Sequence, residues 1–332
     1  MADSTPRVTV VTAVYNCEDF IARTIESIQA QSIDDWEHIC VDDASSDGSA
    51  AIVERYAAED PRVKLIRVEQ NQGAPHARNV GIKNARGEFV AILDSDDVSP
   101  PDRLEICLEA FDADAELGFL GGQHIVIDAN DNVFERIERP ALGDEQFKAS
   151  LMEDGRAPMP HSSFMTRRHL AEAIGGYDER LPCVADYDFA LRISPECKCA
   201  RLDKVVLHYR RRSGQLSETR AFASTLYSDM VRARAEAKAA GREFDEDAAF
   251  ERVRGQVEGR QGLSRKAGLN LRAIALRAVV SGEHDRFRML IKRSAGYWPF
   301  SPHTIFWWLV GFMPDSTQTR CAGLWSRLRT SR

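Results

Sequence analysis

The sequence predicts an α/β protein, built on a mostly parallel, mixed sheet flanked by helices and followed by a helical C-terminal extension. Two observations carry this prediction. Short β-branched runs alternate with helical patterns through about residues 8–100, which is the pattern of βαβ units. One run, Phe89–Leu93, leads straight into the acids Asp94, Asp96 and Asp97. Because open α/β sheets bind ligands at the carboxyl ends of their strands, these acids mark a candidate site.

The first four expected strands are apolar and bounded by turn residues, and they cover residues 8–14, 38–41, 63–68 and 89–93. A helix is expected after each strand, and these helices cover about residues 18–31, 50–59, 74–84 and 101–111. In the first helix, Ile21, Ile25 and Ile28 recur at helical spacing. Connections of this kind join parallel strands and are right-handed. This half of the chain therefore predicts a parallel sheet.

The next part of the chain predicts a mixed sheet instead. Residues 124–127 and 133–134 surround the turn-forming segment Asp128–Asn132, which indicates a β-hairpin. A further strand is expected at 161–166 and a helix at 186–193. Beyond these, residues 221–294 are rich in Ala and Arg with few turn residues, which is typical of surface helices.

Charge is distributed unevenly along the chain. Residues 220–332 hold 20 Lys and Arg against 11 Asp and Glu, a net +9, so with −7 for all 332 residues the first 219 carry −16. Such an acidic body disfavours nucleic-acid binding, and an anionic phosphate ligand would need a metal or nearby arginines there. The basic tail suits an anionic membrane surface.

The cysteines predict a reducing compartment. There are seven, an odd number scattered from Cys17 to Cys321, and a chain of this length does not need a disulfide framework. Cys197 and Cys199 have no second ligand pair near them, and alternate positions on a strand explain their spacing. The first residues lack the basic and apolar regions of a secretory signal. We therefore expect the protein in the cytoplasm.

Residues 297–313 form an aromatic, nearly uncharged segment within the basic tail. Its apolar run is shorter than the roughly 20 residues that span a bilayer, so a transmembrane helix is not expected. A Trp-rich, Arg-flanked segment fits peripheral contact with the inner face of the cytoplasmic membrane. It fits equally a helix that packs its aromatic side chains on the protein or on a second subunit.

The cluster Asp94, Asp96 and Asp97 has two interpretations. Three neighbouring acids repel one another, and a hard divalent metal that prefers oxygen ligands would remove this repulsion. The alternative is that Asp96 and Asp97 cap the helix that follows, as acids at strand-to-helix turns often do. The cluster by itself leaves both interpretations open.

Five motifs stand in a characteristic order along the chain. They are Val10–Asn16, Val41–Ser49, Ala77–Asn79 with Gly81, Leu93–Asp97 with Pro101, and Gly175–Glu179 before Asp186-Tyr187-Asp188. Over about residues 8–217 the chain thus resembles glycosyltransferase family 2, the inverting nucleotide-sugar enzymes of the Rossmann-like GT-A fold. The resemblance implies a catalytic domain over 1–219, with a nucleotide-binding half of about 1–100 and an acceptor half of about 101–219. It does not cover the basic helical region 220–332.

The resemblance implies a metal at the acid cluster. A divalent cation, Mn²⁺ or Mg²⁺, stabilises the charge that develops on a leaving nucleoside diphosphate. Asp96 stands at the family's metal-ligand position, and Asp94 stands where the family approaches ribose or sugar hydroxyls. Asp97 is expected to cap or support the loop.

The resemblance also implies a nucleotide pocket formed by the backbone of Ala13, the ring of Tyr15 and the carboxylate of Asp43. A carboxylate selects a base with a ring N–H, which favours uridine but also admits thymidine or guanosine. The family commonly has Pro or Thr where this chain has Ala13. Arg78 would donate to the nucleotide, or else form a structural ion pair with the acidic strand ends.

Inversion by direct displacement requires a base that removes the proton of the acceptor hydroxyl. The resemblance gives this role to Asp186, although Ala185 replaces the Glu that commonly precedes it. The rival candidate, Asp188, would point to another face of the helix.

Three further residues have alternative interpretations. Arg210 and Arg212 resemble a closing segment that grips the diphosphate as a lid, or else they form a solvated basic loop. His161 is expected to be a hydrogen-bonded structural histidine rather than a residue that contacts the acceptor.

The resemblance, together with these residues, implies an inverting, metal-dependent glycosyltransferase at the cytoplasmic membrane face. It would move a sugar from a nucleotide sugar, preferably a UDP-sugar, to a glycan or lipid-linked acceptor in polysaccharide or cell-envelope glycan synthesis. A nucleotidyltransferase is a weaker alternative, since it would want a Gly-rich basic loop where this chain has Tyr15–Glu18. A non-catalytic nucleotide-sugar-binding protein is also weaker, since it would have lost the base or the metal acids.

Overall fold

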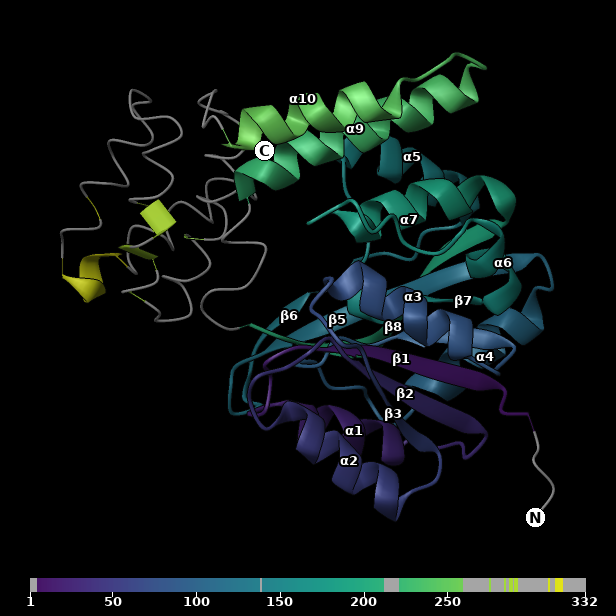
Figure 1. Cartoon of the computed structure of the whole chain (residues 1–332), viewed down its shortest axis with the longest axis vertical. Coiled ribbons are helices and arrows are strands. Elements are labelled where there is room, and N and C mark those ends of the chain that lie inside the picture. Colours follow the sequence, from purple (N-terminus) through teal and green to yellow (C-terminus); the bar gives the residue numbers. More distant parts are fainter. Residues whose placement is uncertain are drawn as a thin grey trace. The chain divides into compact units, whose positions relative to one another are not determined.

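A computed structural model describes residues 5–137, 139–211 and 221–258, together with residues 275, 284, 287, 288, 290, 291, 310 and 314–318. The chain divides into two compact units, Met1–Arg211 and Arg212–Arg332. The sequence predicts a boundary after residue 219, whereas the compact units divide after Arg211. The first unit contains the sheet and the second contains helices α9 and α10 (Figure 1).

The first four strands form the parallel sheet that the alternation predicts. They are β1 (Val8–Val14), β2 (Trp36–Asp42), β3 (Val63–Arg67) and β4 (Phe89–Ile92). Their order in the sheet is β3-β2-β1-β4, and all three pairings are parallel. The direction of strand succession therefore reverses between β1 and β4, which is the point where open α/β sheets bind ligands.

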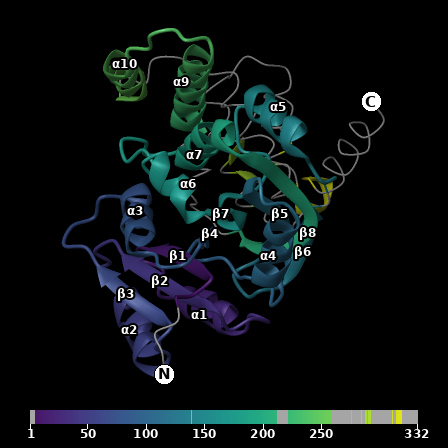
Figure 2. The same ribbon diagram turned by 90° about the vertical axis from the view of Figure 1, so that its right-hand side faces the viewer.

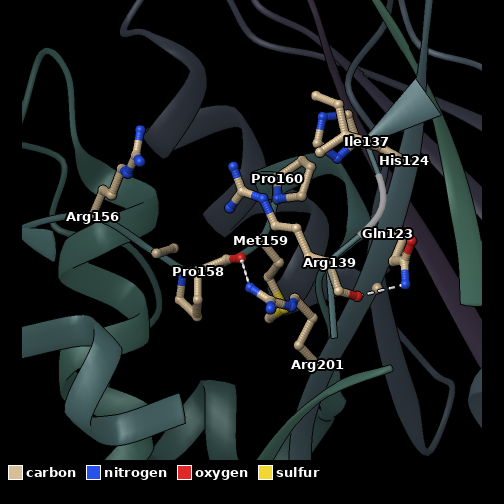
Figure 3. Close-up of a pocket in the computed structure, with 11 residues that line it drawn as sticks. Gln123, His124, Ile137, Arg139, Arg156, Pro158, Met159, Pro160 and Arg201 are labelled. Atoms are coloured by element: carbon tan, nitrogen blue, oxygen red, sulfur yellow. Dashed lines mark hydrogen bonds between the residues drawn. The ribbon is translucent and has the colours of Figure 1, made fainter. Parts of the chain in front are cut away.

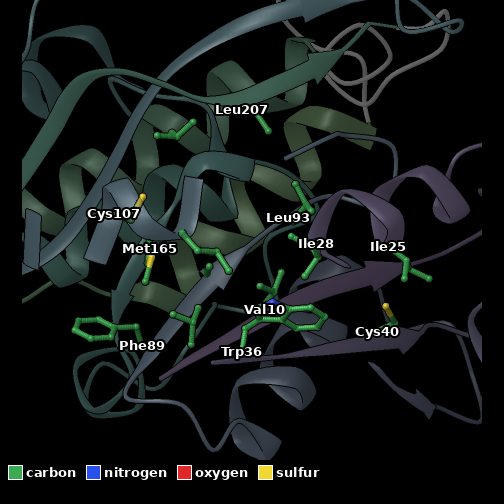
Figure 4. Packing of buried hydrophobic residues seen from close by; sticks show 14 of the residues in the cluster. Val10, Ile25, Ile28, Trp36, Cys40, Phe89, Leu93, Cys107, Met165 and Leu207 are labelled. Carbon is green, nitrogen blue, oxygen red and sulfur yellow. The ribbon is translucent and has the colours of Figure 1, made fainter. Parts of the chain in front are cut away.

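Helices cover both faces of this sheet, namely α1 (Ile21–Gln29), α2 (Ser49–Glu59), α3 (Ala74–Asn84) and α4 (Arg103–Ala113). In Figure 1, α1 and α2 lie on one face and α3 on the other. Strand residues alternate between the two faces: Val10 and Cys40 belong to the core beneath α1, while Ile39 and Val41 pack with Ala77 of α3. Figure 4 shows the larger core, where side chains from α1, α4 and the sheet meet.

The second half of this unit makes the sheet mixed, as predicted (Figure 2). Its strands are β5 (Leu117–Ile127), β6 (Val133–Ile137), β7 (Met165–Arg167) and β8 (Lys198–Arg210). The predicted hairpin is confirmed by the antiparallel β5–β6 pair, and β7 runs antiparallel between β4 and β5. The strand predicted at 161–166 is wrong at its start, because His161–Ser163 forms a 3-10 turn.

Three more helices complete the unit: α5 (Asp144–Asp154), α6 (Arg168–Ala173) and α7 (Ala185–Ile193). Phe119 of β5 anchors two of them, because its ring lies 5.8 Å from that of Phe147 on α5 and 6.0 Å from that of Phe189 on α7. The aromatic cluster thus fixes α7, which carries Asp186, against the mixed half of the sheet.

Close packing of α3 on β1 requires a glycine at position 81. A Cβ atom there would lie 2.3 Å from Cγ1 of Val11. We expect Gly81→Ala to lower the free energy of unfolding by about 1–3 kcal/mol, because the helix must move off the strand. Urea unfolding measures this, with Gly255→Ala as control, since nothing lies within 4 Å of a Cβ there. Equal stability of Gly81→Ala and wild type would contradict the packing argument.

His38 lies wholly buried in β2, with Nε2 2.9 Å from Oγ1 of Thr12. Burial lowers the pKa of His38 to about 3, whereas an unfolded histidine titrates near pH 6.5. Between about pH 3 and 6.5 the folded state therefore binds fewer protons than the unfolded state. The contribution of neutral His38 to the free energy of unfolding is complete above about pH 6.5. It decreases as the pH is lowered through this window, by up to about 1.4 kcal/mol per pH unit.

We expect His38→Gln to reduce this acid dependence. Denaturant titrations of wild type and variant between pH 4 and 7 should give a shallower slope for the variant, whatever its stability at neutral pH. The exposed His169 provides the control His169→Gln, which should keep the wild-type slope. Parallel curves for His38→Gln and wild type would show that His38 is not the group responsible.

In the second unit, α9 (Ala221–Ala239) and α10 (Glu246–Glu258) pack together. The Tyr227 and Phe250 rings lie 6.3 Å apart, and Arg234 pairs with Glu246 at 3.3 Å. The aromatic segment 297–313, apart from Val310, and Arg212 lie outside the described residues. Within the described part of the chain, no helix is both long and apolar enough to span a membrane. The six described cysteines are free thiols.

Candidate active site

The predicted site residues gather at the carboxyl ends of β2, β1 and β4, where β1 is the middle strand. Tyr15 follows β1, Asp43 follows β2, and Asp94 and Asp96 follow β4. The Asp43 N–H donates to the Val14 carbonyl at 2.8 Å, which joins the first two strand ends. The sheet topology therefore brings residues from three separate motifs to one edge.

At the β1 and β2 side, Tyr15 is 49% exposed and is free to stack on a planar ligand. Asp43 is buried, and its carboxylate accepts the backbone N–H groups of Gln72 (2.9 Å) and Gly73 (2.8 Å), which fixes the loop before α3. Its neighbour Asp42 has one buried carboxylate oxygen that lacks a hydrogen-bond partner among the described residues. The structure thus offers two adjacent acceptors where the sequence predicts only Asp43.

Asp94 lies at the centre of the site, held by three residues. Its carboxylate accepts a hydrogen bond from Arg78 at 2.7 Å and lies 3.5 Å from Nδ1 of His161, while its N–H donates to Oγ of Ser162. Burial alone would raise the pKa of Asp94, but the charges of Arg78 and His161 hold it below its usual value. Asp94 is therefore a stable anion.

Arg78 forms the ion pair that the sequence offered as an alternative to nucleotide binding. Its guanidinium also lies 5.7 Å from the centre of the Tyr177 ring, and its Nε has no partner among the described residues. Burial lowers the pKa of Arg78, but Asp94, Tyr177 and Asp186 together raise it above the usual value. The charges of Asp94 and Asp186, which come from opposite halves of the unit, therefore both favour the protonated form of Arg78.

Asp186 and its rival Asp188 have different environments on α7. Asp188 is 1% exposed and bonds Arg192 at 2.8 Å, so its carboxylate is committed to a structural pair. Asp186 lies in the first turn of the helix and is half-buried. The helix start is fixed by Val184, which has φ 59° and whose carbonyl accepts the Asp188 N–H. Of the two acids, Asp186 is thus the less buried, and its role as the base stays a prediction.

Asn79 positions the segment that leads to α7. Its side chain accepts the Tyr177 N–H at 2.7 Å and donates to the Tyr177 carbonyl at 2.9 Å. Gly176 makes this approach possible, because its φ is 68° and a Cβ there would lie 2.3 Å from the Asn79 oxygen. Tyr177 in turn bonds Nε2 of His161 at 2.9 Å. His161 is thus hydrogen-bonded, as predicted, but between Tyr177 and Asp94 within the site.

The helix-cap interpretation of Asp96 and Asp97 is wrong. Helix α4 begins only at Arg103, after a residue that makes no side-chain cap. Asp97 is buried and instead accepts the Arg210 N–H at 2.7 Å, so it supports the loop from inside. Burial and the charges of Asp96 and Asp94 raise the pKa of Asp97 well above its usual value. The expected repulsion among the three acids is therefore present.

Arg210 ties the acidic loop to the β5–β6 turn. Its guanidinium is wholly buried and donates to the Asp96 carbonyl (2.6 Å), the Asp128 carbonyl (2.6 Å) and the Asp131 carboxylate (2.5 Å). The alternative of a solvated loop is therefore wrong for this residue. A grip on the diphosphate stays a prediction, and it would require Arg210 to leave these partners.

The residues fit a divalent cation that arrives with a diphosphate. Among the described residues, no group of three or more His, Cys, Asp or Glu is arranged to hold a metal, so a cage made entirely of protein ligands is not present there. Asp94 pairs with Arg78 and Asp97 is buried beneath the loop, whereas Asp96 is half-buried. Mg²⁺ is commonly held by one or two carboxylates together with substrate phosphates and water. The donor set suits that arrangement.

Comparison with known proteins shows the family to which the chain belongs. A family model described as glycosyl transferase family 2 matches residues 9–175, half of the chain. The chain belongs to glycosyl transferase family 2. Within the family, the uncharacterized glycosyltransferase MJ1057 of Methanocaldococcus jannaschii is 30% identical over 208 residues, which are 62% of this chain and 71% of that protein. The resemblance predicted from the motifs is therefore confirmed.

Other relatives match a shorter part of the chain. The succinoglycan biosynthesis protein ExoO of Rhizobium meliloti is 49% identical over 111 residues, 33% of this chain and only 31% of ExoO's own length. Among solved structures, S. aureus TarS residues 1–349 in complex with UDP-GlcNAc aligns with a TM-score of 0.58 at 19% identity, covering 92% of this chain and 90% of that chain. The predicted GT-A fold is confirmed by this likeness.

Proposed function

We propose that the chain is a metal-dependent, inverting glycosyltransferase that moves a sugar from a UDP-sugar to a glycan or lipid-linked acceptor. The observation that carries this proposal is that Arg78 bonds Asp94, after β4, at 2.7 Å, while the charge of Asp186, on α7, also raises the pKa of Arg78. An acid suited to the donor and an acid suited to the acceptor thus both favour the charged form of the same arginine. Family membership supports the reaction class.

In the proposed reaction, the carboxylate of Asp186 accepts the proton of the acceptor hydroxyl. The oxygen attacks the anomeric carbon while the bond from that carbon to the diphosphate oxygen breaks, which inverts the configuration. The ion pair with Arg78 holds Asp94 as an anion that accepts hydrogen bonds from donor hydroxyls. A divalent cation on Asp96 would supply positive charge to the leaving diphosphate.

Two comparisons support the finer assignments. The TarS complex contains UDP-GlcNAc, which supports a uridine donor, with Tyr15 as the stacking ring and Asp43 or Asp42 as the N–H acceptor. ExoO is named for succinoglycan biosynthesis, which supports a role in polysaccharide synthesis. The backbone of Ala13, next to both strand ends, completes the proposed base pocket.

A nucleotide-sugar screen tests the proposal. Thermal shifts with UDP-, dTDP- and GDP-sugars, with and without Mn²⁺, should show the largest stabilisation for a UDP-sugar in the presence of metal. With a glycan acceptor, the reaction should release UDP. Release of pyrophosphate would instead indicate a nucleotidyltransferase, and binding without release from any acceptor would indicate a non-catalytic protein.

We also propose that the enzyme works at the inner face of the cytoplasmic membrane, through the basic tail. The charge of +9 over residues 220–332 supports this location. The full chain should co-sediment with vesicles that contain anionic lipid, should bind neutral vesicles more weakly, and should be released by high salt. Equal binding to both kinds of vesicle, or to neither, would contradict a contact made by charge.

A further inference from the structure

A cavity of about 170 Å³ lies beside the candidate active site, on the side of the sheet formed by β5, β6 and β8. Three arginines line it from separate segments: Arg139 after β6, Arg156 after α5, and Arg201 on β8 (Figure 3). Its remaining polar lining includes Gln123 and His124. Since no acid is among the lining residues, the cavity presents positive charge.

Hydrogen bonds and close packing fix the wall of this cavity in place. Arg201 is 7% exposed, and its guanidinium donates to the carbonyls of Pro158 (2.7 Å) and Pro140 (2.7 Å). The segment that contains Met159 packs directly on β5, because a Cβ on Gly121 would lie 2.4 Å from Sδ of Met159. These contacts hold the cavity in shape before any ligand arrives.

Two of the three arginines, Arg156 and Arg201, form no hydrogen bond or ion pair with an acid among the described residues. The described hydrogen-bond partners of Arg201 are neutral carbonyls. Burial and the charge of Arg139 lower the pKa of Arg201, and only Asp154 acts in the opposite direction. Arg156 is exposed, with no hydrogen-bond or ion-pair partner among the described residues. Asp203, with Arg139, lines the adjoining hollow and not this one.

The position of the cavity assigns it to the acceptor rather than to the donor. The donor is expected over β1, β2 and β4, whereas β7 separates β4 from β5 in the sheet. The chain that lines the cavity at Pro160 continues into His161 and Ser162, which contact Asp94. The residues that contact Asp94 therefore directly follow a residue that lines the cavity.

We propose that this cavity binds an anionic group of the acceptor, a carboxylate or a phosphate, and so selects an acidic acceptor. Arginine suits this task because its planar N–H groups match both oxyanions. At about 170 Å³ the cavity is smaller than the roughly 300–1,000 Å³ of typical ligand pockets, which suits a small anionic group. The proposal rests on the proposed function, since it names the acceptor class of the same site.

Binding of small sugars to the full chain tests the proposal, with the donor site occupied by saturating UDP and Mn²⁺. The probes are glucuronate, glucose 1-phosphate and neutral glucose, followed by ligand-observed NMR. We expect at least one anionic sugar to bind about tenfold more tightly than glucose. Preference for glucuronate identifies a carboxylate, and preference for glucose 1-phosphate identifies a phosphate.

Variants locate the binding. Arg156→Gln and Arg139→Gln should each weaken the anionic sugar about tenfold, because each removes charge-assisted hydrogen bonds. Arg136→Gln is the matched control, since it removes the same charge from an exposed position of β6 outside the cavity. Equal binding of glucose and both anionic sugars, or equal loss in Arg136→Gln and Arg156→Gln, would overturn the proposal. If wild type binds no UDP yet still prefers an anionic sugar through Arg156, the donor assignment fails and the cavity assignment stands.

Discussion

Replacing Asp186 by Asn is expected to lower kcat by about 10²–10⁴, because the acceptor hydroxyl loses the base that removes its proton. The side chain keeps its size, and Arg78 keeps its ion pair with Asp94. The affinity for UDP should therefore stay within about twofold of wild type, which separates a loss of chemistry from a loss of donor binding. Release of UDP in the presence of acceptor, together with UDP titration, measures both quantities.

Asp188→Asn is the control that separates the two acids of α7. Asp188 is buried against Arg192, so its replacement weakens a structural pair and should lower the free energy of unfolding by about 1–3 kcal/mol. Asp186→Asn should leave that free energy nearly unchanged, since the side chain is half-buried in the first helical turn. If Asp188→Asn proves stable and inactive while Asp186→Asn keeps full turnover, the two roles are reversed.

The parallel half of the fold could be predicted because its signals are local. Each strand and the helix after it lie within a short stretch, and the ends of β1, β2 and β4 carry the acids and turn residues. Strand β5 begins at Leu117, earlier than predicted. The prediction missed this first part because Gly118, Gly121 and Gly122 interrupt the apolar pattern. These glycines are needed where other segments press on the strand, as Met159 does at Gly121. Such contacts leave no periodic signal.

The motifs predicted which residues form the site but not which partners hold them. Asp97 looked like a helix cap because its actual partner, the N–H of Arg210, lies 113 residues further along the chain. His161 looked purely structural because its contacts with Tyr177 and Asp94 join three separate segments. A signal for Asn79 existed, since it directly follows Arg78 in its motif, but its task depends on Gly176, far away in sequence. The motifs identify which residues belong to the site, but their hydrogen-bond partners lie in distant segments and are known only from the fold.

Asp96→Asn is expected to remove the part of the UDP affinity that depends on metal. Wild type should bind UDP at least about tenfold more tightly with Mn²⁺ than with EDTA, since the cation joins an acidic loop to an anionic ligand. The variant should bind UDP with and without Mn²⁺ about equally, because a neutral amide oxygen lacks the negative charge with which a carboxylate attracts a divalent cation. Calorimetric titration of UDP into both proteins under both conditions measures the difference.

Asp97→Asn provides the matched control, because it changes the adjacent acid of the same loop. Asp97 is buried beneath the loop, its oxygen bonds the Arg210 N–H, and an Asn oxygen can accept that bond as well. Burial and the charges of Asp96 and Asp94 raise the pKa of Asp97, and we expect its buried carboxyl to take no direct part in binding the cation. Most of the metal-dependent gain should therefore survive in Asp97→Asn and vanish in Asp96→Asn. Equal loss in both variants would mean that the cation responds to the total charge of the loop and is not bound by Asp96.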